Sequence, residues 1–212
     1  MSTTTENTDL HLSHLDEEGK VQMVDVSHKS ATSRSATARA VGRLSPAAYQ
    51  LLSAQHNAKG EVLNTARVAG VLAAKRCAEL IPMCHSLPLD FVGIDFESDA
   101  AAGTIAVLAT CRTRYTTGVE MEAMTACSIA ALTIYDMCKA AGKEMVIGPT
   151  LLLQKTGGQA EKRASVPFSP GHARTPARRG SLRRAAAGRQ LGIPVAITRA
   201  VYYPSRRAGA PS

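Results

Sequence analysis

Apolar residues recur every three or four positions over residues 61–80, which predicts an amphipathic helix. A longer helix is expected over residues 119–141, because its central part is apolar on nearly every side, and Gly142 is its candidate C-terminal cap. Ser45-Pro46 is a typical helix start, with a capping serine before a proline in the first turn. It predicts a shorter helix over residues 47–55.

Other stretches alternate between apolar and polar residues, as strands do. Strands are expected over residues 31–44, 89–97, 104–112 and 145–153, the middle two forming a hairpin. Gly93 marks a possible bulge where the alternation slips, and Gly148-Pro149 interrupts the last strand. Residues 21–26 fit either a short strand or an ordered arm, and residues 155–158 a mobile loop.

The order of these elements favours an α+β fold in which helices cover an antiparallel sheet, resembling a ferredoxin-like fold. Residues 19–160 are expected to form the folded domain. The polar residues 1–18 are expected to be disordered. Residues 161–212 hold ten arginines and six of the ten prolines, which indicates a disordered basic tail. The same composition also resembles the translation of an unintended reading frame.

The formal net charge of +8 comes from the tail. Residues 162–212 contain 11 basic and no acidic residues, which leaves residues 1–161 with 14 basic and 17 acidic residues, a net charge of −3. The basic balance therefore does not make the folded part a polyanion-binding protein. The sequence contains neither a signal-peptide pattern nor an apolar stretch long enough to span a membrane, so a soluble cytoplasmic protein is expected. The five cysteines suggest free thiols rather than disulfides.

Asp136 and Lys139 are the first candidates for chemistry, because they lie three residues apart at the end of the long apolar helix. Partial burial there would shift their pKa values into a range useful for acid–base catalysis. An ordinary surface ion pair explains the same spacing. Glu120 and Glu122, in the first turn of this helix, are explained equally well by the helix dipole.

The remaining candidates are weak on their own. Cys84-His85 lies in a loop that follows Pro82, where functional side chains are common, but two residues are too few for a zinc site. Scattered cations become significant only if the fold gathers them around a phosphorylated substrate. They are Arg34, Lys59, Lys75, Arg112 and Lys155. The sequence contains no P-loop, no dinucleotide-binding glycine motif and no zinc-protease motif.

Five blocks, in order, are similar to the MoaC family of cyclic pyranopterin monophosphate synthases, over about residues 19–160. They are MVDVSHK (23–29), KGEVLNTARVAGVLAAKR (59–76), LIPMCHSLPL (80–89), TGVEMEAMTACSIAALTIYDMCKA (117–140) and MVIGPTLLLQKTGG (145–158). The resemblance implies a cytoplasmic lyase of molybdenum cofactor biosynthesis. It converts (8S)-3′,8-cyclo-7,8-dihydroguanosine 5′-triphosphate to cyclic pyranopterin monophosphate with release of diphosphate. The purine five-membered ring opens, a pterin ring closes and a cyclic phosphate forms.

The resemblance also implies roles for residues and an assembly. Asp136 and Lys139 match the catalytic acid–base pair. Positions expected to bind substrate are Arg34, Lys59, Lys75, Met83, Cys84, His85, Arg112, Glu120, Met121, Glu122 and Lys155. The three lysines match positions implicated in either binding or proton transfer. The family forms homohexamers, trimers of dimers, with active sites at subunit interfaces. The pair should therefore be half-buried and face a pocket that collects positive charge from neighbouring subunits. No metal site or cofactor is implied, although a divalent cation could accompany the triphosphate.

The chain departs from the family pattern at Thr116, where a Lys or Arg is common, and Arg114 is the nearest cation. The tail is a second departure. It supports a competing interpretation, a module that binds nucleic acid or another anionic surface through its arginines. A third interpretation, an inactive scaffold, is disfavoured because both residues of the acid–base pair are present. No nucleic acid or membrane partner is expected.

Overall fold

The computed structural model describes residues 12–53, 58–158 and 162–163. They belong to the first of two units, residues 1–173, and the second unit, residues 174–212, lies outside the described residues. The elements are β1 (Thr32–Arg43), α1 (Pro46–Ser53), α2 (Ala58–Lys75), α3 (Cys77–Leu80), β2 (Phe91–Asp99), β3 (Thr104–Tyr115), α4 (Glu120–Cys138), the 3-10 helix η1 (Lys139–Ala141), β4 (Val146–Thr156) and β5 (Lys162–Arg163).

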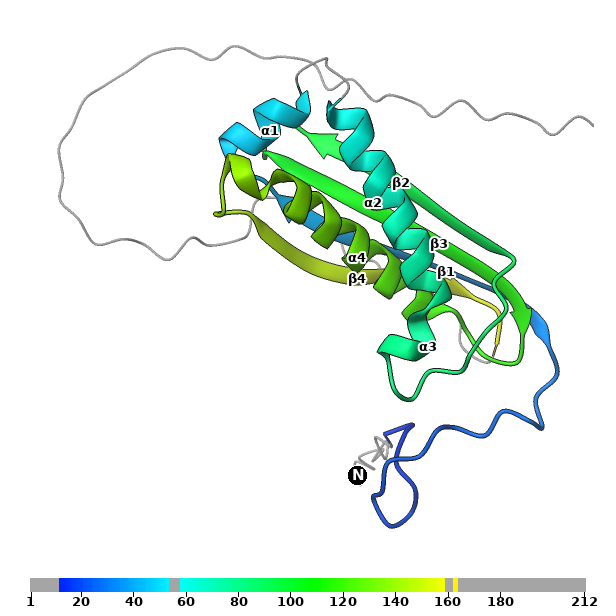
Figure 1. The fold of residues 1–212 in the computed structure, drawn as a ribbon. Coiled ribbons are helices and arrows are strands. Elements are labelled where there is room, and N and C mark those ends of the chain that lie inside the picture. Colours follow the sequence, from blue (N-terminus) through cyan, green and yellow to red (C-terminus); the bar gives the residue numbers. More distant parts are fainter. Residues whose placement is uncertain (1–11, 54–57, 159–161, 164–212) are drawn as a thin grey trace, which may run out of the picture. The chain divides into compact units, whose positions relative to one another are not determined.

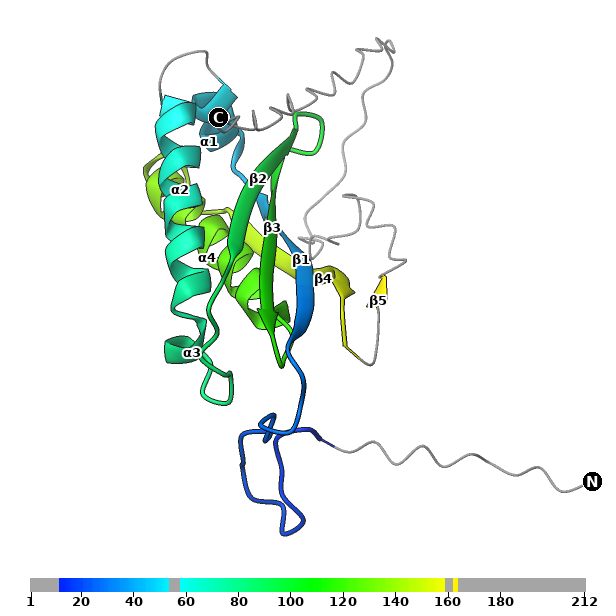
Figure 2. The ribbon, with the colours of Figure 1, turned by 90° about the vertical axis from the view of Figure 1, so that its right-hand side faces the viewer.

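The strands form one antiparallel sheet in the order β2-β3-β1-β4-β5, in which β5 contributes only two residues. Helices α2 and α4 lie side by side on one face of this sheet (Figures 1 and 2). The β-α-β-β-α-β order of the long elements and their placement are those of a ferredoxin-like fold, so the expected fold class is confirmed. Among the described residues no helix has the length and apolar character needed to cross a membrane.

The interface between helices and sheet is built from small residues. The helix-facing residues of β1, Ala36, Ala38 and Ala40, are at most 1% exposed, and Ala126 of α4 is fully buried. Gly70 lets α2 approach α4 closely, because an added Cβ there would lie 3.0 Å from the Ala126 carbonyl oxygen. The absence of Trp from the sequence is consistent with this close packing of small side chains.

The predicted cap at Ser45 and the predicted end at Gly142 are confirmed, although two helices end earlier than expected. The Ser45 hydroxyl accepts a hydrogen bond from the Ala48 backbone N–H at 3.1 Å and caps α1. The second helix ends earlier than expected, at Lys75, because Arg76 leaves the helical conformation before the short helix α3. Gly142 follows η1 with a φ of +150°, which confirms it as the residue that ends this helical segment.

The expected bulge at Gly93 is wrong. Strand β2 pairs with β3 without a register shift from Phe91 to Asp99. The alternation slips because Phe91 is exposed on the face away from the helices, where its ring contacts Arg112. Gly93 leaves room for that ring, since an added Cβ would lie 2.7 Å from it.

The strand that ends the domain is longer than expected. β4 reaches Thr156, so Lys155 is held in a strand rather than in a mobile loop. The interruption at Gly148-Pro149 is confirmed, because the pairing of β1 with β4 shifts register beside these residues. Residues 21–26 form no strand; they belong to an arm, residues 12–31, whose one bridge joins Leu15 to Val21.

The predictions for the two ends of the chain are tested only in part. Residues 1–11 and 164–212, where disorder was expected, lie outside the described residues. Residues 12–18 are described and include turns, in one of which the Asp16 carboxylate accepts hydrogen bonds from the Glu18 and Lys20 backbone.

Candidate active site

Two adjoining cavities lie where the arm, the loop before α4 and the end of β4 meet. The cationic cavity has a volume of about 560 Å³, and its lining includes His28, Lys29, Arg34, Thr116, Glu120 and Lys155. The second, here named the Glu122 cavity, has a volume of about 380 Å³ and is lined by Met83, Cys84, His85, Glu120, Met121 and Glu122, among others. Both cavities share Lys29, Thr117, Gly118 and Glu120. A ligand larger than either cavity could therefore occupy both.

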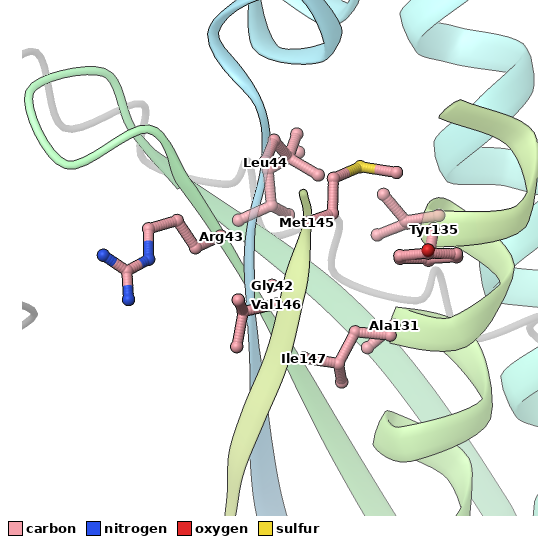
Figure 3. A pocket seen from close by; sticks show the side chains of 10 residues that line it. Gly42, Arg43, Leu44, Ala131, Tyr135, Met145, Val146 and Ile147 are labelled. Atoms are coloured by element: carbon pink, nitrogen blue, oxygen red, sulfur yellow. The ribbon is translucent and has the colours of Figure 1, made fainter. Parts of the chain in front are cut away.

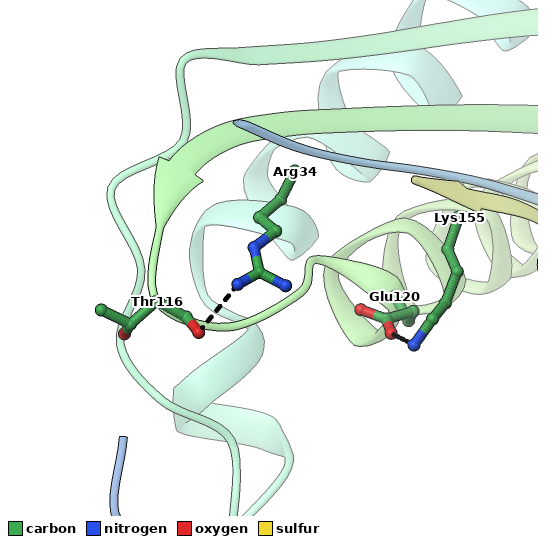
Figure 4. Close-up of polar contacts among 4 residues, drawn as sticks. All are labelled: Arg34, Thr116, Glu120 and Lys155. Carbon is green, nitrogen blue, oxygen red and sulfur yellow. Dashed lines mark hydrogen bonds and ion pairs between the residues drawn. The ribbon is translucent and has the colours of Figure 1, made fainter. Parts of the chain in front are cut away.

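The cationic cavity gathers cations from strands far apart in the sequence. The Arg34 guanidinium, from β1, donates a hydrogen bond to the Thr116 carbonyl oxygen at 3.2 Å (Figure 4). Lys155, from β4, forms an ion pair with Glu120 at 2.6 Å, and both side chains are about a quarter exposed (29% and 26%). Arg34 Nε and Thr116 Oγ1 are buried without a hydrogen-bond partner. These unpaired donors and the nearby lysines suit an anionic ligand.

Two glycines after β4 make room for Arg34. Gly157 and Gly158 have φ angles of +83° and +86°, which side chains rarely adopt. An added Cβ at Gly158 would lie 2.1 Å from Arg34 Nη1, and one at Gly157 would lie 2.2 Å from the Ser33 carbonyl oxygen. A side chain at position 157 would press on the backbone of β1 at Ser33, and one at position 158 would displace the Arg34 guanidinium.

The loop that carries Met83, Cys84 and His85 is anchored at both ends. Its start follows α3, and its end is held to β3 because the buried Thr113 hydroxyl donates a hydrogen bond to the Pro88 carbonyl oxygen. His85 Nε2 lies 2.9 Å from the Val24 carbonyl oxygen, so it donates to the arm. The imidazole therefore links the loop to the arm over the Glu122 cavity.

Glu122 is the buried acid of this site, with 3% of its surface exposed. Burial raises the pKa of its carboxyl group to about 7, and the negative charge of Glu120 acts in the same direction. Burial likewise raises the pKa of the nearby Cys77 and Cys111 thiols to about 12 and raises that of Cys84. These thiols are therefore neutral, and Cys84 is a poor candidate for a nucleophile.

The expected burial of Asp136 and Lys139 is wrong for the single chain. The two side chains form an ion pair at 2.6 Å but are 70% and 56% exposed. Asp136 and Leu132, which is 51% exposed, lie on the outward side of α4, whose opposite side packs in the core, and Lys139 begins η1 directly after α4. Asp136 is sixteen residues beyond Glu120, about 24 Å along the helix, so the pair does not reach the cavities of its own chain.

Two other predicted residues, Lys75 and Arg112, also line neither cavity, and Lys59 comes from another element. Lys59 lies in the first turn of α2, which begins at the end of the helix layer where α4 finishes (Figures 1 and 2). Lys75 is exposed at the other end of α2. Arg112 lies on the sheet face away from the helices, with its guanidinium carbon 4.1 Å from the centre of the Phe91 ring. The structure thus brings eight of the predicted residues together along the two cavities, and Lys75, Arg112, Asp136 and Lys139 lie outside them.

A sequence comparison decides the family. Residues 23–158 match the model of the MoaC family. The chain belongs to the MoaC family. It is 66% identical over 149 residues to the cyclic pyranopterin monophosphate synthase of Bordetella pertussis, covering 70% of this chain and 92% of that protein. Proteins of the same name from Roseiflexus sp. and Geobacillus kaustophilus are 53% and 50% identical, covering 70% and 69% of this chain and 94% and 92% of theirs.

Some cavity residues of this MoaC family member were not singled out from its sequence. His28 and Lys29 line the cationic cavity, and Thr117 and Gly118 line both cavities. The only signal for them was their position within the family-like blocks of residues 23–29 and 117–140. Arg114, the nearest cation to the Thr116 departure, is exposed and lines neither cavity, so Arg34 rather than Arg114 occupies this part of the family member's site.

A third cavity in this MoaC family member is not a candidate. It lies between α4 and the start of β4, and its lining includes Leu44, Ala131, Tyr135, Met145 and Ile147 (Figure 3). Its volume of about 10 Å³ leaves no space for a substrate. Within the described ranges, no group of three or more His, Cys, Asp or Glu residues could hold a metal ion.

Proposed function

We propose that this MoaC family member is a cyclic pyranopterin monophosphate synthase, a lyase of molybdenum cofactor biosynthesis. It converts (8S)-3′,8-cyclo-7,8-dihydroguanosine 5′-triphosphate to cyclic pyranopterin monophosphate and releases diphosphate. The observation that carries the proposal is the pair of joined cavities, one cationic and one with a buried acid. The shared family and the names of the relatives support it.

The joined cavities suit the two parts of this substrate. Its triphosphate would lie in the cationic cavity, where Arg34 Nε has no partner and Lys29 and Lys155 add charge. Its fused rings would lie in the Glu122 cavity, next to His85. Lys155 would then be shared between its carboxylate partner, Glu120, and the phosphates.

We propose that a second copy of the chain completes this site. Asp136 lies about 24 Å along α4 from Glu120, which lines both cavities, and Lys139 lies farther along the chain, so the pair can act on the same substrate only from a neighbouring subunit. Lys59 begins α2 at that same end of the helix layer. A homohexamer built as a trimer of dimers would place these residues over a neighbour's cavities. The general acid–base role of Asp136 and Lys139 belongs to this proposal.

The other parts of the proposal concern cofactor and location. The enzyme is proposed to use no resident cofactor, although a divalent cation would accompany the triphosphate. It is proposed to act in the cytoplasm, as a biosynthetic enzyme that takes up a nucleotide-derived substrate. Activity of the purified protein before and after treatment with a chelator tests the cofactor proposal, with magnesium added back to restore the substrate's cation.

The decisive assay measures diphosphate release from the cyclised dihydroguanosine triphosphate. The wild-type protein is expected to release diphosphate, and the Asp136→Asn variant is expected to be inactive because it lacks the carboxylate. Asp95→Asn is the matched control, since Asp95 is exposed on β2 and lines neither cavity. A wild-type protein without turnover, or an Asp136→Asn variant as active as the control, would overturn the proposal.

Mixed oligomers test whether the site is shared between subunits. The Asp136→Asn subunit keeps its cavities intact, and a His85→Ala subunit keeps its α4 end intact. Random co-assembly of the two inactive variants should restore about a quarter of the sites. A restored site needs its cavities from an Asp136→Asn subunit and its Asp136 from a His85→Ala subunit, and each condition is met in about half of the cases. If one chain formed the whole site, mixing would restore no activity.

The competing interpretation makes a different prediction. If the basic tail made this protein a nucleic-acid-binding module, DNA binding would weaken steeply with salt and vanish when the tail is removed. Turnover that survives removal of the tail would separate the enzyme from that alternative.

A further inference from the structure

We propose that Glu122 is an additional catalytic residue, which gives a proton to the substrate when the purine five-membered ring opens and takes one back when the pterin ring closes. This inference rests on the proposed function. It assigns to Glu122 a role in proton transfer beyond holding the substrate.

The position of Glu122 is unusual for an acid. Glu122 is 3% exposed, yet it lines the cavity that would hold the substrate's rings. In the part of the chain that the structure describes, no Lys or Arg pairs with it, and its hydrogen-bond partner is its own backbone N–H. Glu120, two residues earlier, instead pairs with Lys155 at 2.6 Å. Two neighbouring carboxyl groups thus have opposite environments, which is typical of sites that divide acid and base roles.

Among the described residues, none of the groups around Glu122 forms an ion pair with it. The thiols of Cys77, Cys84 and Cys111 face it from α3, the following loop and β3, and burial keeps all three protonated. Other titratable or charged residues at the cavity are His14, Lys29, His85 and Glu120. His85 Nε2 is directed to the Val24 carbonyl oxygen, and Glu120 is negative. A carboxyl group in this setting holds its proton to near neutral pH.

A proton held near neutral pH matches the chemistry of the rings. When the C–N bond of the five-membered ring breaks, its electron pair goes to the nitrogen, which takes the proton of the Glu122 carboxyl group, while the lone pair of the other ring nitrogen forms a C=N bond to the same carbon. When a nitrogen later adds to a C=N or C=O carbon to close the pterin ring, the double-bond electrons move to the heteroatom, the attacking nitrogen loses a proton, and the Glu122 carboxylate accepts it. The residue therefore returns to its starting state, and an acid whose pKa lies near the working pH is the most effective donor.

The test compares wild-type enzyme with Glu122→Gln, which keeps the shape of the side chain but cannot transfer a proton. We expect kcat to fall by about a hundredfold or more, with KM changed by less than about threefold. In the wild type, kcat/KM should fall as the pH rises through about 7, and this decrease should be absent in the variant. Glu79→Gln is the matched control, because Glu79 is exposed on α3 and lines neither cavity.

A second measurement does not depend on turnover. With ¹³C-labelled glutamate side chains, NMR should show one carboxyl group that titrates near pH 7 in the wild type and is missing in Glu122→Gln. This measurement decides the question if the variant fails to assemble: a wild type in which every glutamate titrates below pH 6 overturns the inference.

The kinetic outcomes also separate the two proposals. A wild-type enzyme that releases no diphosphate overturns the proposed function and this inference with it. An active wild type with an equally active Glu122→Gln variant overturns the inference alone. So does a variant that changes only KM, because Glu122 would then bind the substrate without transferring a proton.

Discussion

The burial of Glu122 predicts that this one residue makes the protein less stable as the pH rises. The pKa of its carboxyl group rises from an ordinary value of 4.5 to about 7 on folding, because the folded state disfavours the charged form. Each pKa unit corresponds to about 1.4 kcal/mol, so the ionised carboxylate lowers the free energy of unfolding by about 3 kcal/mol. The Glu122→Gln variant removes this cost.

The sign follows from proton binding. Between the two pKa values the folded protein keeps the proton while the unfolded chain releases it, so the stability that the protonated form provides is complete below pH 4.5. It is lost as the pH rises to about 7 and changes little above that. The free energy of unfolding of Glu122→Gln minus that of the wild type should therefore be about 3 kcal/mol larger at pH 8 than at pH 4.5.

Urea unfolding at a series of pH values between 4.5 and 8 measures this difference by linear extrapolation. Both proteins must be compared at one protomer concentration, because assembly adds concentration-dependent stability. Glu79→Gln controls for the loss of an acidic residue at an exposed position of α3. A difference between wild type and Glu122→Gln that stays constant over this pH range would refute the reasoning, because Glu122 would then be ionised as readily in the folded protein as in the unfolded chain.

Four further predictions concern other parts of the molecule. Lys155→Met should raise KM for the triphosphate substrate by about tenfold or more, because a charge-assisted contact is lost from the cationic cavity; an unchanged KM would place the phosphates elsewhere. Thr116→Lys should lower KM, since it adds a cation to the same cavity, and an equal KM would dismiss that idea. Gly70→Ala should lower the free energy of unfolding by about 1–3 kcal/mol in urea, because its Cβ would press on α4, whereas wild-type stability would show that α2 can move away at no cost. Deleting residues 163–212 should leave diphosphate release and the size-exclusion profile essentially unchanged, and a loss of either would show that the tail takes part in assembly or catalysis.

Local patterns were sufficient to predict most of the elements. The cap at Ser45 depends on a hydroxyl and a backbone N–H three residues apart, and Gly142 ends a helical segment through its own backbone conformation. The period of the apolar residues depends on neighbours within two turns of a helix or a few positions of a strand. The ferredoxin-like order followed from the succession of these elements. The role of Gly93 was predicted wrongly. The glycine makes room for the Phe91 ring, and that ring contacts Arg112, which lies on the partner strand.

The site depended on tertiary structure. The sequence by itself determined most of the elements, the contrast in charge between residues 1–161 and 162–212, and, through its motifs, the family. Only the fold decided that Arg34 and Lys155 reach one cavity, that Glu122 is buried, and that Asp136 is exposed, about 24 Å along α4 from Glu120. The physical reason is that burial and proximity are set by long-range strand pairing and helix packing. Two residues on one helix can therefore share a sequence pattern and yet lie in opposite environments.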